Sequence, residues 1–328
     1  QRQMCIRDRQ VCRDLIYSMA AGTFCTAIFL TVLYVRRRES GGTCSLSFWR
    51  YGRLAFPVAL GGCLTAALST ANDTLIPITL RQSGSSASRA LEQFGTFEGV
   101  VIPVLFFPST MLCALSGILI PEIARANAAG NQRRVCQLTE RVIQLTLIFA
   151  ILIAAILLKF GGRVGYWMDG GTLSGKMIRI LAPVVPFIYL EIVLEALLKG
   201  MGKQNFSSLN YLAEYVIRIC VVLIFIPLFG FYGIVASYYT SNVFGNCNRL
   251  RMAAKTANMP FHPGKLLGKP LFAVVFSFAV AALPELFCPA LRERAVGMVL
   301  FLGIALPLYV LVFWLLRERH TWVTCREW

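Results

Sequence analysis

Long apolar runs separated by short charged connectors dominate this chain. No Asp, Glu, Lys or Arg occurs within residues 15–35, 142–158, 219–248 or 295–316. An apolar helix of about 20 residues crosses the hydrocarbon core of a bilayer. These four runs therefore predict membrane-spanning helices and exclude a protein with a single membrane anchor.

The full pattern predicts an all-α, polytopic membrane helix bundle with about nine transmembrane helices. The segment Pro227-Leu-Phe-Gly-Phe-Tyr-Gly233 predicts a tight turn in the longest uncharged run, because proline and glycine end helices. The predicted spans lie at about 15–35, 54–80, 97–120, 138–158, 179–199, 207–229, 231–250, 270–289 and 295–316.

Composition supports lipid as the main solvent of the chain. Hydrophobic residues make up 57% of the 328 positions and charged residues 15%, against roughly a quarter charged in soluble domains. The formal net charge of +16 is typical of nucleic-acid binding in a soluble protein. Here nearly all the basic residues lie in connectors, where they meet anionic headgroups, so no nucleic-acid partner is expected.

The distribution of basic residues predicts an orientation. If the predicted spans cross the membrane in alternating directions, the connectors on one side carry 19 Lys and Arg residues, including Arg249. The connectors on the other side carry nine. Basic connectors favour the cytoplasmic side. We therefore expect a multi-pass protein of the bacterial cytoplasmic (inner) membrane, with a cytoplasmic C-terminus and with Val11 outside.

The N-terminal segment QRQMCIRDR resembles translated sequencing adaptor, so residues 1–10 are excluded from the sequence argument as an expected artefact. On this interpretation Val11 lies inside a longer parent protein, and the first helices of that parent are missing from this sequence. An outside N-terminus without a signal peptide agrees with that expectation.

The chain lacks the sequence signals of common enzymes. Its two histidines, His262 and His320, lie in predicted connectors, and it has no Walker loop, GxGxxG or HExxH motif. The 11 cysteines occur singly, without zinc spacing, and are expected to be reduced and unpaired. We therefore predict a protein that is not an enzyme and holds no cofactor or metal.

Polar residues inside the predicted spans form the list of candidate substrate or ion pathway residues. An ionisable group in the bilayer costs roughly 2.5–3.5 kcal/mol on insertion scales and usually faces a cavity or a partner. The candidates are Asn72, Asp73, Glu98, Glu191, Glu214 and Arg218.

Glu214 and Arg218 have two interpretations. Their i, i+4 spacing, with the acid first, favours an ion pair that neutralises both inside the bundle. Alternatively Arg218, interpreted as the one clear cation in mid-membrane, binds an anionic substrate group such as a phosphate. Asp73 has no cation within one helical turn and is expected to face an aqueous cavity.

Prolines lie inside several predicted spans, for example Pro103, Pro108, Pro183 and Pro186. Broken helices are typical of transporters that rock about a central site. Ordinary packing of kinked helices is the alternative.

Three segments resemble polysaccharide-export flippases, and most closely the stage V sporulation protein B branch of the multidrug/oligosaccharidyl-lipid/polysaccharide exporter superfamily. In the first, residues 94–124, the similarity lies in Pro103, Phe107-Pro108, Ala114-Leu-Ser116 and Pro121-Glu-Ile123, followed by Asn127-Ala-Ala-Gly-Asn131. The others are Lys199-Gly-Met-Gly-Lys203 and Gly230-Phe-Tyr-Gly-Ile-Val-Ala236. The resemblance extends over most of residues 54–316.

This resemblance implies the C-terminal lobe of a 14-helix, MATE-like transporter that works by alternating access. Residues 11–53 would hold the last helix of the first lobe and a cytoplasmic linker, residues 54–250 the second six-helix lobe, and residues 251–328 the final two helices and a cytoplasmic tail. The implied substrate is a polyprenyl-linked oligosaccharide, polysaccharide or peptidoglycan precursor in a membrane-lipid environment.

Two other functions stay open at the level of sequence. A cation-coupled multidrug exporter of the same superfamily is the first alternative, because acids outnumber bases among the candidates. The coupling cation would then be a further partner. A membrane scaffold or a membrane-embedded glycosyltransferase is the third class.

Overall fold

The computed structural model describes residues 2–37, 48–84, 86–169, 171–259, 263–287 and 295–315. All regular elements of these residues are helices, which confirms the predicted all-α membrane bundle. His262, His320 and the predicted cytoplasmic tail lie outside the described residues. The elements are α1 (Arg2–Arg37), α2 (Phe48–Gln82), α3 (Ala87–Thr96), η1 (Phe97–Val101), α4 (Ile102–Phe106), η2 (Phe107–Ser109), α5 (Thr110–Ala128), α6 (Gln132–Asp169), α7 (Thr172–Leu181), η3 (Ala182–Val184), α8 (Val185–Gly200), α9 (Gln204–Phe229), α10 (Phe231–Thr256), α11 (Pro263–Ala281), α12 (Leu283–Phe287) and α13 (Ala295–Leu315).

Where the structure describes them, the predicted spans fall largely on helical residues, although Ala282 divides the span predicted at 270–289 between α11 and α12. The helices are not equally apolar. Within the described residues, seven helical segments are long and apolar enough to cross a membrane. The predicted spans 54–80 and 231–250 correspond to α2 and α10, which are 35 and 26 residues long but are not among the seven. Both carry polar residues among the apolar ones, and in α10 many of these are buried.

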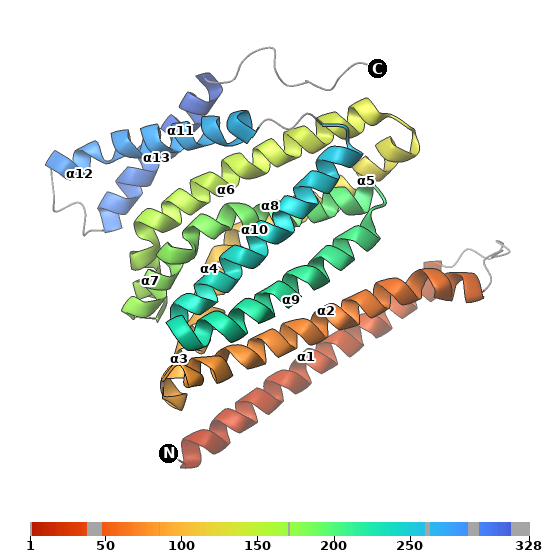
Figure 1. The fold of residues 1–328 in the computed structure, drawn as a ribbon, viewed down its shortest axis with the longest axis horizontal. Coiled ribbons are helices and arrows are strands. Elements are labelled where there is room, and N and C mark those ends of the chain that lie inside the picture. The colour runs from red at the N-terminus through yellow and green to blue at the C-terminus, as the bar shows by residue number, and fades with distance from the viewer. Residues whose placement is uncertain are drawn as a thin grey trace. The chain divides into compact units, whose positions relative to one another are not determined.

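The chain divides into two compact units, Gln1–Ala55 and Phe56–Trp328. In the second unit, α9 packs on α10, α10 on α8, and α8 on both α5 and α6. Helix α6 also contacts α7 and α11, and α11 pairs with α13 (Figure 1). Helix α8 is therefore the central helix of this unit, since it contacts neighbours on several sides.

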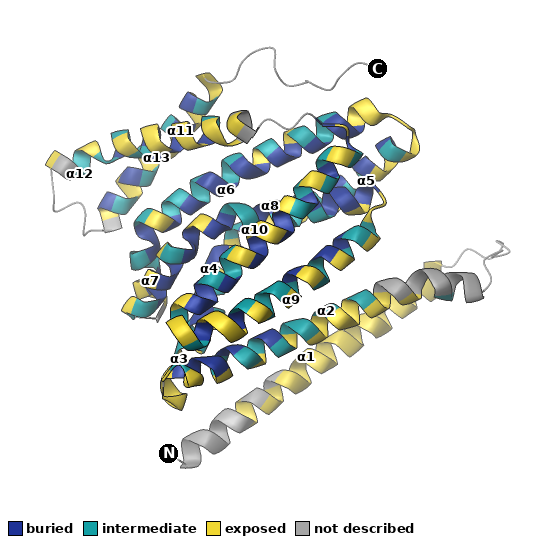
Figure 2. Ribbon diagram, viewed as in Figure 1, coloured by how far each residue is buried: buried dark blue, intermediate teal, exposed yellow. Residues whose placement is uncertain are grey.

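Polarity is distributed as expected for a protein solvated by lipid. Large apolar side chains such as Phe107, Ile118 and Leu228 are 78%, 72% and 71% exposed, whereas Thr139 and Arg249 are fully buried. Exposed yellow positions recur along most helices in Figure 2. A monomer in water rarely exposes so much contiguous apolar surface. The chain is a multi-pass membrane protein.

Two of the long helical segments are interrupted near prolines. Residues 87–128 contain the π-helical turn η1 and the 3₁₀ turn η2, which includes Pro108, and residues 172–200 contain the 3₁₀ turn η3, which includes Pro183. Two tyrosines, one buried and one partly buried, donate hydrogen bonds to carbonyl groups near these breaks. The Tyr189 hydroxyl donates to the Leu105 carbonyl at 2.9 Å, and the Tyr239 hydroxyl donates to the Ile180 carbonyl at 2.8 Å. Side chains of neighbouring helices thus supply hydrogen bonds to backbone groups at the breaks, because the hydrocarbon of the lipid cannot supply them.

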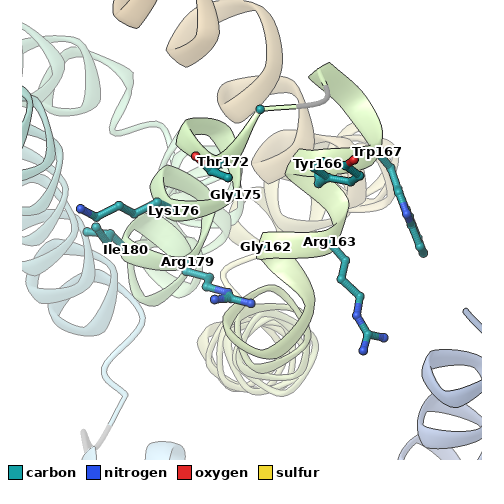
Figure 3. A pocket seen from close by; sticks show the side chains of 10 residues that line it. Gly162, Arg163, Tyr166, Trp167, Thr172, Gly175, Lys176, Arg179 and Ile180 are labelled. Carbon is teal, nitrogen blue, oxygen red and sulfur yellow. The ribbon is translucent and has the colours of Figure 1, made fainter. Parts of the chain in front are cut away.

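Glycines allow the closest helix contacts of the second unit. A Cβ atom on Gly175 of α7 would lie 2.7 Å from the Cα atom of Gly162 in α6 (Figure 3). The close approach of the two helices therefore needs glycine, which has a hydrogen atom in place of a side chain. Between α9 and α10, Gly230 has a φ of 57°, which a glycine adopts without strain. The predicted turn at Pro227 to Gly233 is confirmed.

The cysteines differ in part from the expectation of unpaired thiols. Cys25, Cys63, Cys113, Cys220 and Cys247 are free. Cys136, which is buried in α6, is disulfide-bonded, so the prediction is wrong at this position. Pairing needs two Cα atoms within about 4.4–6.8 Å of each other, and spacing along the chain does not reveal such proximity.

Candidate functional site

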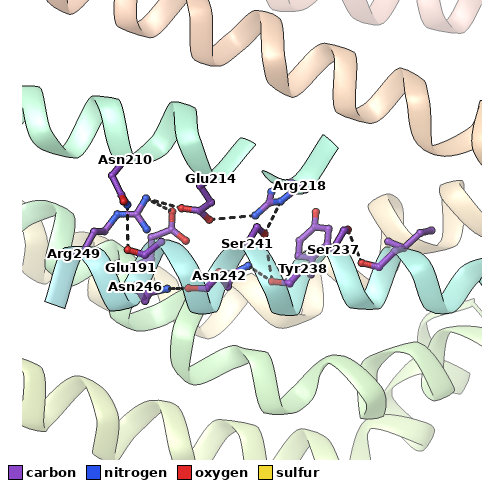
Figure 4. A network of polar contacts seen from close by, with 12 residues as sticks. Glu191, Asn210, Glu214, Arg218, Ser237, Tyr238, Ser241, Asn242, Asn246 and Arg249 are labelled. Carbon is purple, nitrogen blue, oxygen red and sulfur yellow. Dashed lines mark hydrogen bonds and ion pairs between the residues drawn. The ribbon is translucent and has the colours of Figure 1, made fainter. Parts of the chain in front are cut away.

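A buried charge network joins three helices of the second unit. It consists of Glu191 on α8, Glu214 and Arg218 on α9, and Arg249 on α10 (Figure 4). We call these four residues the buried charge network. Three of them, Glu191, Glu214 and Arg218, were predicted as pathway candidates from the sequence, and the network lies on three consecutive helices.

Arg249 is the centre of the network. Its Nη2 atom lies 3.2 Å from Oε1 of Glu191 and 3.0 Å from Oε2 of Glu214, and its side chain is 0% exposed. The guanidinium also lies over the Tyr211 ring, 5.0 Å from its centroid. One buried cation therefore neutralises carboxylates from two different helices.

The sequence interpretation of Arg249 was wrong. The sequence pattern places Arg249 among the cytoplasmic connector charges and leaves Arg218 as the one clear cation in mid-membrane. Helix α10 continues to Thr256, two turns beyond Arg249, so Arg249 lies within the packed part of the helix. The predicted charge asymmetry survives without this residue, but the network has two cations.

A signal for Arg249 was present in the sequence. Five polar residues of α10 and one glycine recur at spacings of three or four, which places them along one helix face. The structure buries all of these positions, which are Ser237, Ser241, Asn242, Gly245, Asn246 and Arg249.

Glu214 and Arg218 form the predicted ion pair. The Nη2 atom of Arg218 lies 3.4 Å from Oε1 of Glu214, and the side chains are 12% and 3% exposed. The Nε group of Arg218 donates a hydrogen bond to Ser241 Oγ at 3.0 Å. Its guanidinium carbon lies 4.6 Å and 5.2 Å from the ring centroids of Tyr238 and Tyr215. Arg218 thus remains near the edge of the network, held by one carboxylate and two aromatic rings.

Gly245 makes room for the Glu214 carboxylate. A Cβ atom at Gly245 would lie 2.8 Å from Cδ of Glu214 and 2.9 Å from Nη1 of Arg249. The Gly245 carbonyl also accepts a hydrogen bond from Asn210 Nδ2 at 3.1 Å. The missing side chain at this position therefore lets α9 and α10 enclose the ion pairs.

Asp73 and Glu98 extend the acidic character of the region. Asn72 donates a hydrogen bond from Nδ2 to Oδ1 of Asp73 at 3.1 Å. Glu98, in the π-helical turn η1, interacts electrostatically with Asp73 and with Arg218. In the part of the chain that the structure describes, neither Asp73 nor Glu98 forms an ion pair within 4.0 Å. π-Helical turns are frequent at functional sites.

The described candidates therefore fall into one region. Arg218 connects the acidic pair Asp73 and Glu98 with the buried charge network, because it interacts with Glu98 and with Glu214. None of the six predicted residues is fully exposed. Outside this region, Glu195 on α8 forms a separate ion pair, with Oε1 2.7 Å from Nζ of Lys199 one turn further along the helix.

The ionisable groups of the region are carboxylates and guanidinium groups. No group of three or more His, Cys, Asp or Glu side chains suited to a metal ion occurs among the residues described above. Four carboxylates face two guanidinium groups, so the region carries an excess of two negative charges when all six groups are ionised.

Comparison with known proteins gives two distant similarities. The chain is 24% identical over 137 residues to sporulation protein YkvU of Bacillus subtilis (strain 168), a match that covers 42% of this chain and 31% of that protein. It is 23% identical over 173 residues to stage V sporulation protein B of the same organism, which covers 51% of this chain and 33% of that protein. The chain is distantly homologous to these sporulation proteins.

The matched part spans only about a third of each of these relatives. No family model and no solved structure matches the chain. The similarity agrees with the resemblance to the stage V sporulation protein B branch.

Proposed function

We propose that this chain is part of a membrane transporter in which Arg218, at the edge of the buried charge network, and the Asp73 and Glu98 pair line the substrate path. The observation that carries the proposal is the fully buried Arg249 between Glu191 and Glu214 in a lipid-solvated bundle. Ionisable groups kept inside a membrane bundle at such cost usually serve a substrate, an ion or a proton. Breaks in two long helical segments support the same function.

As substrate we propose a polyprenyl-linked glycan precursor, flipped across the bacterial cytoplasmic membrane by alternating access. Support comes from the distant similarity to stage V sporulation protein B and from the motifs at residues 94–131, 199–203 and 230–236. In this proposal the C-terminus is cytoplasmic, a preceding lobe completes the cavity within the multidrug/oligosaccharidyl-lipid/polysaccharide superfamily, and the protein catalyses no covalent step.

Within this proposal Arg218 is the residue that exchanges partners. Glu214 contacts Arg218 through Oε1 and Arg249 through Oε2. If Arg218 turns to a substrate phosphate, Glu214 keeps Arg249 and is not left as an unpaired buried charge. An arginine suits this role because its planar group binds phosphate oxygens in pairs. Arg249, which has no exposed surface, holds the three helices together instead.

A transport assay with matched arginine variants tests this proposal. The protein is reconstituted in liposomes with a fluorescent polyprenyl-linked saccharide, and loss of label from one leaflet is measured. Arg218→Gln should lower the rate by about tenfold or more, Arg218→Lys should restore part of it, and Arg134→Gln should leave it unchanged. Arg134 forms an exposed ion pair with Glu122 at 3.0 Å, so it controls for the loss of a surface arginine. Equal rates for Arg218→Gln and the unchanged protein would end the proposed role.

A cation-coupled drug exporter is the second candidate function. The excess of carboxylates over guanidinium groups favours it, because such a region attracts a cationic drug or a coupling ion. Asp73→Asn and Glu98→Gln should then raise drug accumulation in cells that express the protein, while Glu122→Gln should not. If drug accumulation is unchanged in both variants while saccharide flipping is intact, the drug-exporter function is contradicted and only the glycan proposal remains.

A further inference from the structure

A basic pocket lies where α6 ends and α7 begins. It has a volume of about 720 Å³ and is lined by residues of these two helices and of the turn between them. The cationic lining residues are Arg163, Lys176 and Arg179, and the aromatic ones are Tyr166 and Trp167. This volume is within the range of about 300–1,000 Å³ that is usual for ligand pockets. The pocket contains none of the buried charge network.

Among the described residues, the three cations of the pocket have no acidic partner. Arg163, Lys176 and Arg179 form no ion pair with any carboxylate of the described residues, and no acidic side chain is among those that line the pocket. By contrast Lys159, one turn before Arg163 on α6, is paired with Glu285 at 2.8 Å. Three uncompensated cations around one concave site attract an anion.

The glycine contact between the helices positions Arg179. A Cβ atom on Gly162 would lie 2.6 Å from Cζ of Arg179, so the guanidinium rests on the bare backbone of α6. Figure 3 shows the side chains of Arg163 and Arg179 extending to the same side of the α6 and α7 pair. Lys176 points towards α10 instead, with Nζ 5.6 Å from the centroid of the Tyr232 ring. Two guanidinium groups are therefore presented together.

The pocket lies at the level expected for lipid headgroups. Helix α6 has 38 residues, which at about 1.5 Å per residue makes it much longer than a hydrocarbon core of about 30 Å. Its uncharged part ends at Leu158, so Arg163 and the residues after it extend beyond the core. Tyr166 and Trp167 are 60% and 58% exposed, and tyrosine and tryptophan are enriched at the membrane interface.

We propose that this pocket binds the phosphate group of a lipid at the membrane interface, through Arg163 and Arg179, while Lys176 in the pocket lining adds positive charge. Arginine binds phosphate oxygens by paired, charge-assisted hydrogen bonds. Helix α7 begins at Thr172 in the pocket wall, and the positive end of its dipole adds to the attraction. Tyr166 and Trp167 pack against the upper part of the acyl chains. The site is separate from the proposed substrate path.

The phosphate has two possible sources, and the experiment distinguishes them. The full chain is placed in nanodiscs of phosphatidylcholine, and binding of a spin-labelled phosphatidylglycerol is titrated. A long-chain polyprenyl pyrophosphate is then added as competitor. Binding that the competitor does not displace identifies a bilayer phospholipid as the occupant, and displacement identifies the pyrophosphate of a lipid-linked substrate. Both results support a lipid-phosphate site.

The variants test whether the pocket is the binding site. The double variant Arg163→Gln with Arg179→Gln should weaken binding of phosphatidylglycerol by about tenfold or more. Arg89→Gln, which removes an exposed arginine of α3 that is not among the pocket residues, should leave binding unchanged. Gly162→Ala keeps every charge but displaces the Arg179 guanidinium, and should weaken binding several-fold.

Two results would overturn the proposal. One is equal binding by the double arginine variant and the unchanged protein. The other is an equal loss of binding in Arg89→Gln, since this would show a general surface-charge effect. Neither result depends on transport, so failure of this site leaves the proposed transport function untouched.

Discussion

The Nη2 atom of Arg249 lies 3.0 Å from Oε2 of Glu214, on a neighbouring helix and out of contact with solvent. The same nitrogen lies 3.2 Å from Oε1 of Glu191 on a third helix. Removing one partner of a buried ion pair is costly because the other charge is left uncompensated. The contact between α8, α9 and α10 therefore depends on Arg249, and the stability of the bundle can be used to test this.

Arg249→Met should destabilise the folded protein by about 3–5 kcal/mol, because it leaves Glu191 and Glu214 without their shared cation. The measurement is reversible unfolding of the purified protein in mixed detergent micelles. Arg134→Met is the matched control, since Arg134 forms an exposed ion pair that contributes at most about 1 kcal/mol. Equal losses in the two variants would contradict a central role for Arg249.

Gly245→Ala should destabilise the protein by about 1–3 kcal/mol. The added methyl group would meet the Glu214 carboxylate, whose Cδ is 2.8 Å from the built Cβ position. Gly117→Ala in α5 serves as control, because nothing lies within 4 Å of its Cβ position, and alanine there should stabilise the helix by about 0.5–1 kcal/mol. A neutral or stabilising Gly245→Ala would show that Glu214 is not held against this backbone.

Tyr189→Phe should cost about 0.5–1.5 kcal/mol. The hydroxyl of Tyr189 is buried and donates at 2.9 Å to the Leu105 carbonyl near the break at η2, and this carbonyl has no access to water as a substitute. Tyr34→Phe is the control, since Tyr34 is 71% exposed. If the free energy of unfolding is the same in Tyr189→Phe and the unchanged protein, the break does not need this bond.

Lys159 and Glu285 should show a coupling energy of about 1–2 kcal/mol in a double-mutant cycle of Lys159→Met and Glu285→Gln. Their atoms Nζ and Oε2 are 2.8 Å apart, with exposed fractions of 28% and 15%. Nζ also lies 3.6 Å from the centroid of the Phe301 ring. The interaction thereby joins α6 to α12 and α13.

The same cycle on Glu195 and Lys199 is the comparison for this pair. These residues lie one turn apart on α8 and are 30% and 40% exposed, so a coupling of about 0.3–0.5 kcal/mol is expected. A coupling for Lys159 and Glu285 no larger than this would mean that their contact does not hold α12 against α6.

The membrane architecture could be predicted from the sequence because it depends on local composition. Charge-free runs such as 142–158 and 295–316 must be helical in lipid, since only a helix satisfies all of their backbone groups within one segment. The turn at Gly230 and the ion pair of Glu214 with Arg218 are also local, the first through a residue with positive φ and the second through i, i+4 spacing. Such features need no knowledge of neighbouring helices.

Only the tertiary structure decided which charges on different helices meet. Arg249 is preceded by a polar stretch and followed by basic residues, so its local sequence is typical of a connector. Its burial results from the packing of α8, α9 and α10, which brings Glu191 to it from 58 positions away along the chain. The basic pocket likewise depends on how closely Gly162 lets α7 approach α6. Contacts of this kind are determined by side-chain packing between helices. The periodicity of a single helix indicates which of its faces is buried, but not which residues of other helices that face meets.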